Sequence, residues 1–376
     1  MALYLGLMSG TSMDGVDAVL IEADALPATA AVQVVAHGHW PMPAELRRRL
    51  IALNQVGSDE LHGAALAANG ISALYARAVR SLLEAARVDS NEVVALGAHG
   101  QTVRHRPGEF DSSGYTIQLL NGALLAELTD IDVVCDFRSR DVAAGGQGAP
   151  LVPAFHGAMW SRAGQALSVL NIGGIANLSL LKADGAVGGF DCGPGNVLMD
   201  LWCEQHLAQA FDAEGVWAAS GQVHTGLLAR MLADPYFERA PPKSTGRDLF
   251  HGAWLRNCLE GLQNQAKIRA QDVQATLAQL TAQTAASALR LHLPESARLL
   301  VCGGGALNTQ LMRLLAEQLP GIPVQSTAAV GMPPLQVEAA AFAWLAQAFT
   351  RRLPGNRPEV TGASGLRLLG ALYPAR

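Results

Sequence analysis

The same pattern of two apolar runs around a glycine-rich turn occurs twice in this chain. The first copy, LYLGLMSGTSMDGVDAVLIEA, turns at residues 9–15 and enters its second apolar run at Val16. The second copy, ALSVLNIGGIANLSLL, covers residues 166–181 and turns at Gly173 and Gly174. Apolar runs joined by Gly, Ser, Thr and Asp are typical of β-hairpins. The repetition predicts two halves that are built on one plan.

Strand and helix patterns continue along the rest of the chain. Residues 33–39 predict a third strand, and VVALGAHGQTVRHRP predicts a short buried strand that runs into a polar loop. A long helix is predicted at 60–88, and the leucines on its apolar side are Leu61, Leu66, Leu74, Leu82 and Leu83. Further helices are predicted at 197–210, 252–267, 275–292, 306–319 and 335–349. This mixture predicts an α/β fold with a central mixed sheet flanked by helices in each of two lobes.

The length of 376 residues exceeds what one ordinary hydrophobic core supports, so two domains are expected. The stretch RDVAAGGQGAPLVP, residues 140–153, has the composition of turns and loops throughout. We therefore predict a domain boundary there, with an N-terminal domain at 1–150 and a C-terminal domain at 151–376.

Charge and cysteine content exclude several classes of protein. The net charge is −5, and the longest basic run is Arg47, Arg48 and Arg49, which argues against a nucleic-acid partner. The five cysteines form no C-x-x-C pair, so the chain predicts neither a disulfide framework nor a zinc site, and a cytoplasmic location fits best. Apolar segments are interrupted well before 18 residues and the N-terminus lacks a basic stretch, so neither a membrane span nor a signal peptide is expected.

Three glycine-rich turns each follow an apolar strand, at residues 10–15, 173–174 and 303–305. Backbone N–H groups exposed in such turns can bind phosphate. The alternative is that these glycines only close tight turns. No lysine follows any of the three, which excludes a P-loop of the G-x-x-x-x-G-K-[ST] type.

Two isolated carboxylates are candidates for catalysis. Asp191 lies in GGFDCGPGNVLMD among apolar residues and glycines, which suits a general base, although an Asp can also organise a turn. Glu338 is the only charged residue between Glu317 and Arg351, in an alanine-rich helix, so it is either paired or functional. A helix N-terminal acid that interacts with the helix dipole is the alternative for Glu338.

Two polar segments that follow strands are candidates for substrate binding. HGQTVRHRP supplies His99, Gln101 and Thr102, and CDFRSRD supplies Arg138. Arginine with amide and hydroxyl partners suits a polyhydroxy substrate that bears a carboxylate. No G-x-S-x-G or H-E-x-x-H motif is present, so a hydrolase receives no support.

These segments together resemble the anhydro-N-acetylmuramic acid kinase family, within the actin/hexokinase/Hsp70 group. The resemblance implies a two-lobed actin/hexokinase-like fold with an interlobe cleft. The matching segments run from Gly6 to Asn308 and extend further through PPLQVEAAAFAWLA. They are GLMSGTSMDGVDA, AHGQT, CDFRSRDVAAGGQGAPLVP, NIGGIANLS, GFDCGPGN and CGGGALN.

The resemblance implies an ATP-dependent kinase that opens 1,6-anhydro-N-acetylmuramic acid by hydrolysis and phosphorylates O6. The products would be N-acetylmuramic acid 6-phosphate and ADP, in peptidoglycan recycling. Asp191 would be the catalytic base, and Glu338 an acid near the sugar. The residues that would face the sugar and its lactyl carboxylate are His99, Gln101, Thr102 and Arg138.

The resemblance also implies three groups of nucleotide-binding residues. They are Gly10, Thr11, Ser12, Met13, Asp14, Gly15, Val16 and Asp17; then Asn171, Gly173, Gly174, Gly193, Gly195 and Asn196; and then Gly303, Gly304, Gly305 and Asn308. Mg²⁺ is expected with ATP, because phosphate oxygens supply most of its ligands. Related sugar kinases often carry an Asp where Leu7 stands here, so Asp14 or Asp17 could be the protein ligand.

Two other functions remain open at this stage. One is another sugar or acid kinase of the same fold, because a fold alone does not define a function. The other is a nucleotide-gated binding or assembly protein, which would turn over nucleotide without a small acceptor. The family resemblance also implies a homodimer.

Overall fold

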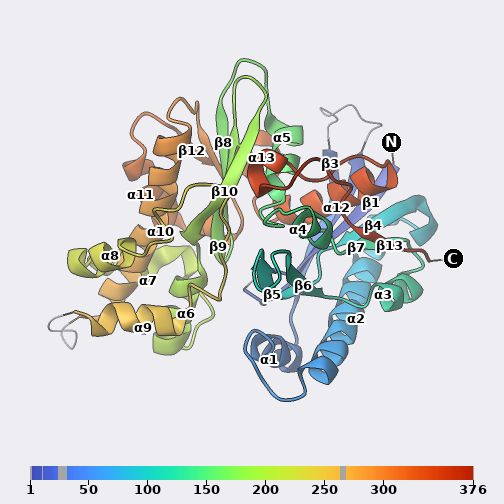
Figure 1. Ribbon diagram of the computed structural model, residues 1–376, viewed down its shortest axis with the longest axis horizontal. Helices are drawn as coiled ribbons and strands as arrows, with labels where there is room; N and C mark the ends of the chain where they lie inside the picture. The colour runs from blue at the N-terminus through green and yellow to red at the C-terminus, as the bar shows by residue number, and fades with distance from the viewer. Residues whose placement is uncertain (1, 11, 24–31, 263–267, 376) are drawn as a thin grey trace. The chain divides into compact units, whose positions relative to one another are not determined.

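The computed structural model describes residues 2–10, 12–23, 32–262 and 268–375 (Figure 1). The chain forms two compact units: Met1–Trp160 together with Leu335–Arg376, and Ser161–Pro334. This division differs from the predicted domains 1–150 and 151–376, because the C-terminal segment belongs to the first unit. The helix α12 (Val337–Thr350) packs against the sheet of the first unit, and this packing determines the division.

The first unit is built on a six-stranded mixed sheet with the order β13-β7-β4-β1-β2-β3. The neighbours β1, β2 and β3 are antiparallel, β1, β4 and β7 are parallel, and β13 is antiparallel to β7. The strands are β1 (Ala2–Met8), β2 (Gly15–Ala23), β3 (Val32–Pro41), β4 (Val93–Ala98), β7 (Val133–Cys135) and β13 (Ala371–Tyr373).

The second unit contains a five-stranded sheet with the order β10-β9-β8-β11-β12. Its strand directions repeat those of β3-β2-β1-β4-β7, because β8, β9 and β10 are antiparallel and β8, β11 and β12 are parallel. The prediction of two halves on one plan is therefore confirmed. The strands are β8 (Leu167–Ile172), β9 (Ile175–Leu181), β10 (Val187–Pro194), β11 (Leu299–Cys302) and β12 (Val324–Ser326).

Helices accompany the sheet in each unit, and the α/β class is confirmed. The first unit carries α1 (Ala44–Ala52), α2 (Glu60–Ala86), α3 (Gly122–Thr129), α4 (Ser139–Ala143), α5 (Val152–Trp160), α12 and α13 (Pro358–Thr361). The second carries α6 (Val197–Leu207), α7 (Val216–Ala219), α8 (Thr225–Leu232), α9 (Gly252–Glu260), α10 (Ala270–His292) and α11 (Thr309–Gln318). Residues 263–267 of the helix predicted at 252–267 lie outside the described residues.

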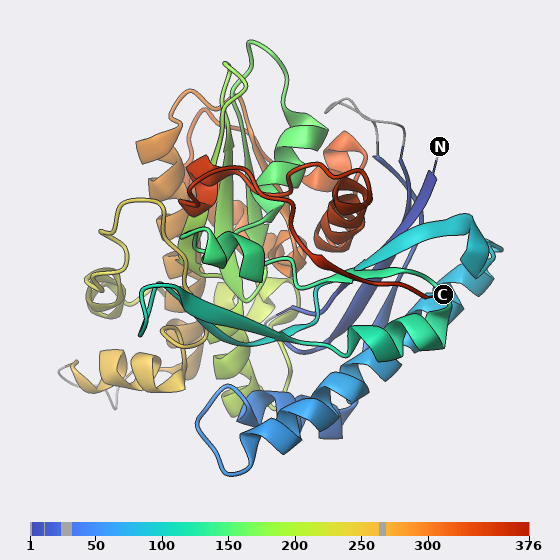
Figure 2. The ribbon, with the colours of Figure 1, turned by 45° about the vertical axis from the view of Figure 1, so that its right-hand side comes forward.

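The two faces of the first sheet are covered by different helices. Leu5 and Leu7 of β1 join the hydrophobic core formed with α1 and α2. The alternate position Gly6 faces α12, where an added Cβ would overlap the carbonyl oxygen of Ala339. Figure 2 shows α2 and α12 on opposite sides of the blue strands of this sheet.

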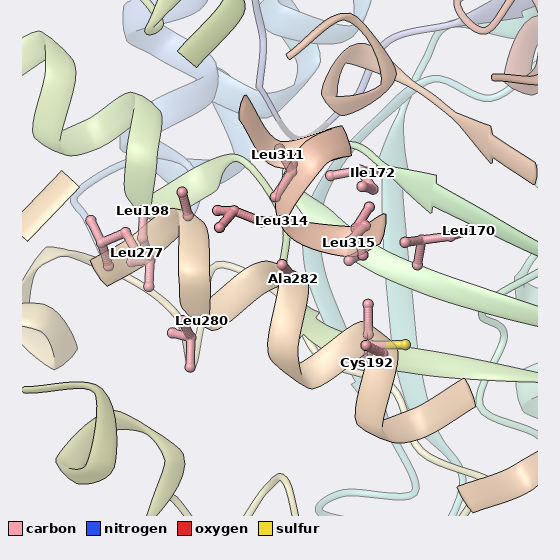
Figure 3. Close-up of a cluster of buried hydrophobic side chains, with 14 of the residues drawn as sticks. Leu170, Ile172, Cys192, Leu198, Leu277, Leu280, Ala282, Leu311, Leu314 and Leu315 are labelled. Atoms are coloured by element: carbon pink, nitrogen blue, oxygen red, sulfur yellow. The ribbon is translucent and has the colours of Figure 1, made fainter. Parts of the chain in front are cut away.

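The second sheet buries one face against α6, α10 and α11. Figure 3 shows this core, in which Leu170 and Ile172 of β8 lie near Leu311 and Leu315 of α11. Side chains at the alternate strand positions point to the opposite face. That face carries Asp191.

Two details differ from the predictions. The predicted polar loop after Ala98 is largely a strand, β5 (Gln101–Pro107), which pairs with β6 (Gly114–Leu119). Leu61 and Leu66, predicted on the apolar side of α2, are 89% and 43% exposed, whereas Leu74, Leu82 and Leu83 are buried. Among the residues that the structure describes, no helix combines the length and the apolar composition needed to cross a bilayer.

Candidate functional site

In the first unit, the parallel strands β1, β4 and β7 all end at one edge of the sheet. In open α/β sheets, ligands bind outside the carboxyl ends of such strands. Most of the candidate residues of this unit lie in the turns that follow these three strands. The His99 N–H donates to the carbonyl of Leu7 at 3.0 Å, which joins the end of β4 to the end of β1.

The first glycine turn is closed by its own backbone, with the Met13 N–H donating to the Gly10 carbonyl at 3.2 Å. Met13 has a positive φ of 55°, and both its side chain and that of Val16 are buried in the core. These two residues can therefore contact a ligand only through their backbone. Thr11 lies outside the described residues.

The two carboxylates of this turn already have polar partners. Ser12 Oγ donates to Asp14 Oδ1 at 2.7 Å, and Asp17 Oδ1 lies 2.9 Å from His39 Nδ1. The hydrogen bond to Asp17 is the main cause that raises the pKa of His39. Sequence reasoning missed His39, because its position opposite Asp17 follows from the register of β2 and β3.

His99 and Arg138 form a hydrogen-bonded pair. Arg138 Nε and Nη2 lie 3.1 and 2.9 Å from His99 Nε2, and Arg138 Nη1 donates to the Gly148 carbonyl at 2.8 Å. Since Arg138 donates to Nε2, the ring proton belongs on Nδ1, which lies 2.8 Å from the Gly100 carbonyl. Burial, assisted by the Arg138 charge, lowers the pKa of His99, so the ring is neutral.

Gln101 connects this pair to the first glycine turn. It is fully buried and its Nε2 donates to the Gly10 carbonyl at 3.1 Å. The structure thus brings Gly10, His99, Gln101 and Arg138 together at one edge of the first sheet. Thr102 instead accepts a hydrogen bond from Gln118 Nε2 at 3.2 Å, within the β5–β6 hairpin.

Glu338 lies in the first turn of α12 and is partly exposed. This position agrees with the alternative of an acid at a helix N-terminus. Asp191 belongs to the other compact unit.

In the second unit, a row of polar side chains crosses the sheet on the face away from α10. Directly paired residues are Asp191 with Asn177, Asn177 with Asn171, and Asn171 with Cys302. Paired residues of neighbouring strands point to the same face. Asn177, which was not predicted as a site residue, therefore lies between Asp191 and Asn171.

The Asp191 backbone and carboxylate are held by the segment that follows α8. Asp191 Oδ2 accepts from the Thr245 N–H at 2.9 Å, and the Tyr236 hydroxyl donates to the Asp191 carbonyl at 2.8 Å. Burial, and then the charge of Asp191, raise the pKa of Tyr236. Lys243 lies with Nζ 4.8 Å from the Tyr236 ring centroid, and burial lowers its pKa. No local sequence signal connects residues 236–245 with Asp191.

Glycines allow the turns of the second unit to approach one another. A Cβ at Gly195 would overlap the carbonyl oxygen of Gly173, and one at Gly303 would lie 2.6 Å from Asn171 Oδ1. A Cβ at Gly305 would overlap the side chain of Ile172. The structure brings together Asn171, Gly173, Gly174, Gly195, Asn196, Gly303, Gly304 and Gly305.

Gly193 and Asn308 have neighbours of other kinds. A Cβ at Gly193 would lie 2.7 Å from the Phe237 ring. Asn308 Oδ1 accepts from the Leu311 N–H at 2.9 Å and so caps α11. The side-chain oxygen of Asn308 therefore already has a hydrogen-bond partner within the protein.

Within the part of the chain that the structure describes, no group of three or more His, Cys, Asp or Glu side chains could hold a metal ion. Asp14 and Asp17 nevertheless supply the hard oxygen donors that Mg²⁺ prefers, and Mg²⁺ commonly takes one or two carboxylates together with phosphate oxygens. These two residues fit such a shared site.

Each unit carries the same order of strands, with a glycine-rich turn after its first strand. This duplication defines the class: a two-unit α/β protein in which the second sheet repeats the strand plan of the first. The comparison with protein families is more specific: the anhydro-N-acetylmuramic acid kinase family matches residues 2–375, and the chain belongs to that family.

Three relatives match this chain over nearly the whole length of both sequences. The chain is 58% identical to the anhydro-N-acetylmuramic acid kinase of Variovorax paradoxus (strain S110), over 99% of each chain. It is 56% identical to that of Cupriavidus metallidurans, over 99% of this chain and 97% of the relative, and 53% identical to that of Albidiferax ferrireducens, over 99% of each.

Solved structures give only distant similarity. The activator of the 2-hydroxyisocaproyl-CoA dehydratase from Clostridium difficile, with bound ADPNP, is 10% identical with a TM-score of 0.49, over 93% of this chain and 96% of that chain. A ROK family glucokinase from Streptomyces griseus, in complex with glucose and AMPPNP, is 12% identical with a TM-score of 0.40, over 92% and 99%. The family assignment rests on the sequence relatives.

Proposed function

We propose that this chain uses ATP to convert 1,6-anhydro-N-acetylmuramic acid into N-acetylmuramic acid 6-phosphate and ADP, in peptidoglycan recycling. The observation that carries the proposal is the family match over residues 2–375. The buried carboxylate of Asp191 supports it further, because a positioned carboxylate can act as a general base.

In the proposed reaction, Asp191 takes a proton from a water molecule whose oxygen attacks C1 of the sugar. A bond forms between the water oxygen and C1, and the bond from C1 to the bridging oxygen breaks. The released oxygen, O6, attacks the γ-phosphorus, whose bond to the leaving oxygen of ADP breaks. Positioning and neutralisation of charge are the main contributions of a protein to phosphoryl transfer.

The Thr245 N–H suits the role proposed for Asp191. By donating to Oδ2 at 2.9 Å, it fixes the orientation of the carboxylate that is proposed to take the proton. Asn177, next to Asp191 in the row across the sheet, is close enough to help orient water there. Glu338 is proposed as a second acid near the sugar.

The glycine turns are proposed to bind ATP through backbone N–H groups, with the first turn and the turn at Gly173 and Gly174 on the phosphates. The turn at 303–305 would lie against the adenosine. Mg²⁺, held by the phosphates and by Asp14 or Asp17, would neutralise phosphate charge. Arg138, with its neutral partner His99, is proposed to bind the lactyl carboxylate.

The reaction can be tested by mass spectrometry of the product formed from the anhydro sugar, ATP and Mg²⁺ in ¹⁸O-labelled water. We expect a sugar 6-phosphate with one ¹⁸O at C1, because water attacks that carbon. Unchanged sugar with intact ATP would contradict the proposal. Phosphorylation of plain hexoses alone would favour another sugar kinase, and ATP hydrolysis indifferent to sugar would favour a nucleotide-gated binding protein.

Replacing the proposed base tests its role. Asp191→Asn should lower kcat by about 10²–10⁴, the usual contribution of general-base catalysis. The Kd for ATP should change less than about twofold, since an amide can still accept from the Thr245 N–H. Steady-state kinetics and calorimetry with ATP measure the two quantities.

Asp184→Asn is the matched control. Asp184 is an exposed carboxylate in the turn between β9 and β10 that accepts from the Ala186 N–H. This variant should keep near-normal activity. If Asp191→Asn lost ATP binding together with turnover, Asp191 would be structural.

We further propose a cytoplasmic location and a homodimer. All five cysteines are free and buried, which fits a reducing compartment. Light scattering on the purified chain would decide the oligomeric state.

A further inference from the structure

Asp141, in α4, carries a buried carboxyl group that the proposed reaction does not use. Its side chain is fully buried. Oδ2 accepts from the Gly148 N–H at 2.8 Å, and Oδ1 accepts from Asn356 Nδ2 at 2.7 Å and from Thr361 Oγ1 at 2.8 Å. The two oxygens therefore face two different segments of the first unit, the loop after α4 and the C-terminal segment.

The C-terminal segment 356–367 is tied to this loop by further hydrogen bonds. The Gln147 N–H donates to the Thr361 carbonyl at 2.7 Å, and the Ser364 N–H donates to the Ala144 carbonyl at 2.8 Å. Asn356 Oδ1 accepts from the Arg367 N–H at 2.7 Å, which fixes the amide that contacts Asp141. In Figure 1, α13 lies next to α4, in agreement with these bonds.

The sequence is adapted to this close approach. A Cβ at Gly146 would overlap the Asp141 carboxyl group, and Gly148 has a φ of 65°, which favours glycine. The loop can therefore fold over Asp141 only because these positions carry glycine.

The other side of the same loop contacts the candidate sugar site. The Gly148 residue that donates to Asp141 also accepts from Arg138 Nη1 at 2.8 Å, and Arg138 Nε and Nη2 face His99. The guanidinium plane is thus fixed by acceptors on two elements. An arginine binds a carboxylate best when its planar donors are held in one orientation.

We propose that Asp141 is a positioning residue, through which the C-terminal segment 356–367 holds Arg138 in the orientation that binds the carboxylate of the sugar. The identity of the sugar rests on the proposed function. Asp141 itself contacts neither substrate in this proposal. It fixes Gly148, and Gly148 fixes Arg138.

The test compares two substitutions at Thr361, which is buried and donates its hydroxyl to Asp141. Thr361→Val removes the donor with little change of shape, whereas Thr361→Ser keeps it. We expect Thr361→Val to raise the KM for the sugar about tenfold, as loss of a hydrogen bond to a carboxyl group can do. The KM for ATP should stay within about twofold, and Thr361→Ser should resemble the parent chain.

Asp141→Asn extends the series. An asparagine at this position has one accepting oxygen and one donating NH₂ group, and this NH₂ group would face a donor of either the loop or the C-terminal segment. The KM for the sugar should therefore rise further than in Thr361→Val. Should this variant not fold, the Thr361 pair still decides the question. An unchanged KM for the sugar in Thr361→Val, or equal changes for sugar and ATP, would overturn the proposal.

Hydrogen exchange separates this inference from the proposed function. Amides at 144–148 should exchange faster in Thr361→Val than in Thr361→Ser, whichever substrate the chain uses. Equal exchange rates of these amides in the two variants would overturn the proposed link between the loop after α4 and the C-terminal segment. If the parent chain did not turn over the anhydro sugar, the proposed function would be wrong, and exchange alone would decide the link.

Discussion

Histidine protonation is the residue-scale property with the clearest consequence. Burial lowers the pKa of His156 to about 3, and burial with the nearby Arg138 charge lowers that of His105 to about 4. Burial likewise lowers the pKa of His99. All three belong to the first unit, which therefore contains neutral histidines at pH 7.

Stability of the first unit should fall with acid. An unfolded histidine takes up a proton near pH 6.5, whereas these folded ones do not, so the unfolded state binds more protons below that pH. The stabilisation is complete above about pH 6.5 and is lost as the pH falls from there towards 4. Each histidine can contribute a slope of up to about 1.4 kcal/mol per pH unit.

Denaturant unfolding at pH 7.5, 6.5, 5.5 and 4.5 measures this dependence. In His156→Gln the free energy of unfolding should depend less steeply on pH, by the contribution of one histidine, because the variant has no titrating ring at that position. A free energy of unfolding that stays constant from pH 7.5 to 4.5 would contradict the neutral, buried state of these residues.

A local pattern singles out Asp191 among glycines, and its catalytic role stays a prediction. No local pattern singles out Asn177 or His39, because each is brought into the candidate site by the residue opposite it, Asp191 or Asp17. The register of neighbouring strands decides such pairs, and a single sequence does not display it.

At the scale of elements, α12 lies directly on the first sheet. Gly6 of β1 and Gly97 of β4 face its backbone, and a Cβ at either position would overlap a helix carbonyl, that of Ala339 or that of Phe342. Glycine is therefore needed at these two strand positions for α12 to lie this close to the sheet.

Gly6→Ala should destabilise the protein by about 1–3 kcal/mol or more, the cost of overpacking a core. Gly63→Ala, on α2, is the control, because its Cβ would meet only Leu53 Cδ2 at 3.9 Å. Alanine in a helix should stabilise by about 0.5–1 kcal/mol. Chemical denaturation of both variants tests the two opposite signs, and equal stabilities would show that α12 moves away without cost.

Most elements were predicted from periodicity, including the first hairpin, α2 and α10. The strand β5 was predicted as a loop, because its residues are polar, as suits a two-stranded ribbon with β6. The C-terminal segment could not be placed, since its contacts with Asp141 join residues distant in sequence. Hydrogen bonds of this kind leave no periodic pattern.

At the scale of the whole molecule, the two sheets share one order of strands, and each supplies a glycine-rich turn after its first strand. The predicted boundary at 150/151 missed the return of residues 335–376 to the first unit. A change in composition can mark a loop between two domains. It does not reveal that the first unit consists of two separate stretches of the chain, because this depends on which sheet α12 covers.

ATP binding should raise the melting temperature. At 100 times its Kd, a ligand that binds only the folded state adds about 2.7 kcal/mol to the free energy of unfolding. Gly195→Ala should reduce this effect, because the new Cβ would overlap the carbonyl oxygen of Gly173 in the proposed phosphate turn.

Gly188→Ala is the matched control for that experiment, since its Cβ would meet only Leu180, at 3.5 Å or more. Differential scanning fluorimetry with and without ATP compares the three chains. An equal ATP shift in Gly195→Ala and Gly188→Ala would argue against a nucleotide contact at the Gly173 turn.

The return of the chain to its first unit also sets an order of events during synthesis. Ribosomes release a chain at about 5–20 residues per second, so after Trp160 the first unit waits roughly 9–35 s for α12 to emerge. Throughout that interval Ser161–Pro334 can complete its own core, while the glycine-bearing face of the earlier sheet stays uncovered. The N-terminal half is therefore made first and finished last, and in a growing cell it is the part with the longest exposure to chaperones and to aggregation.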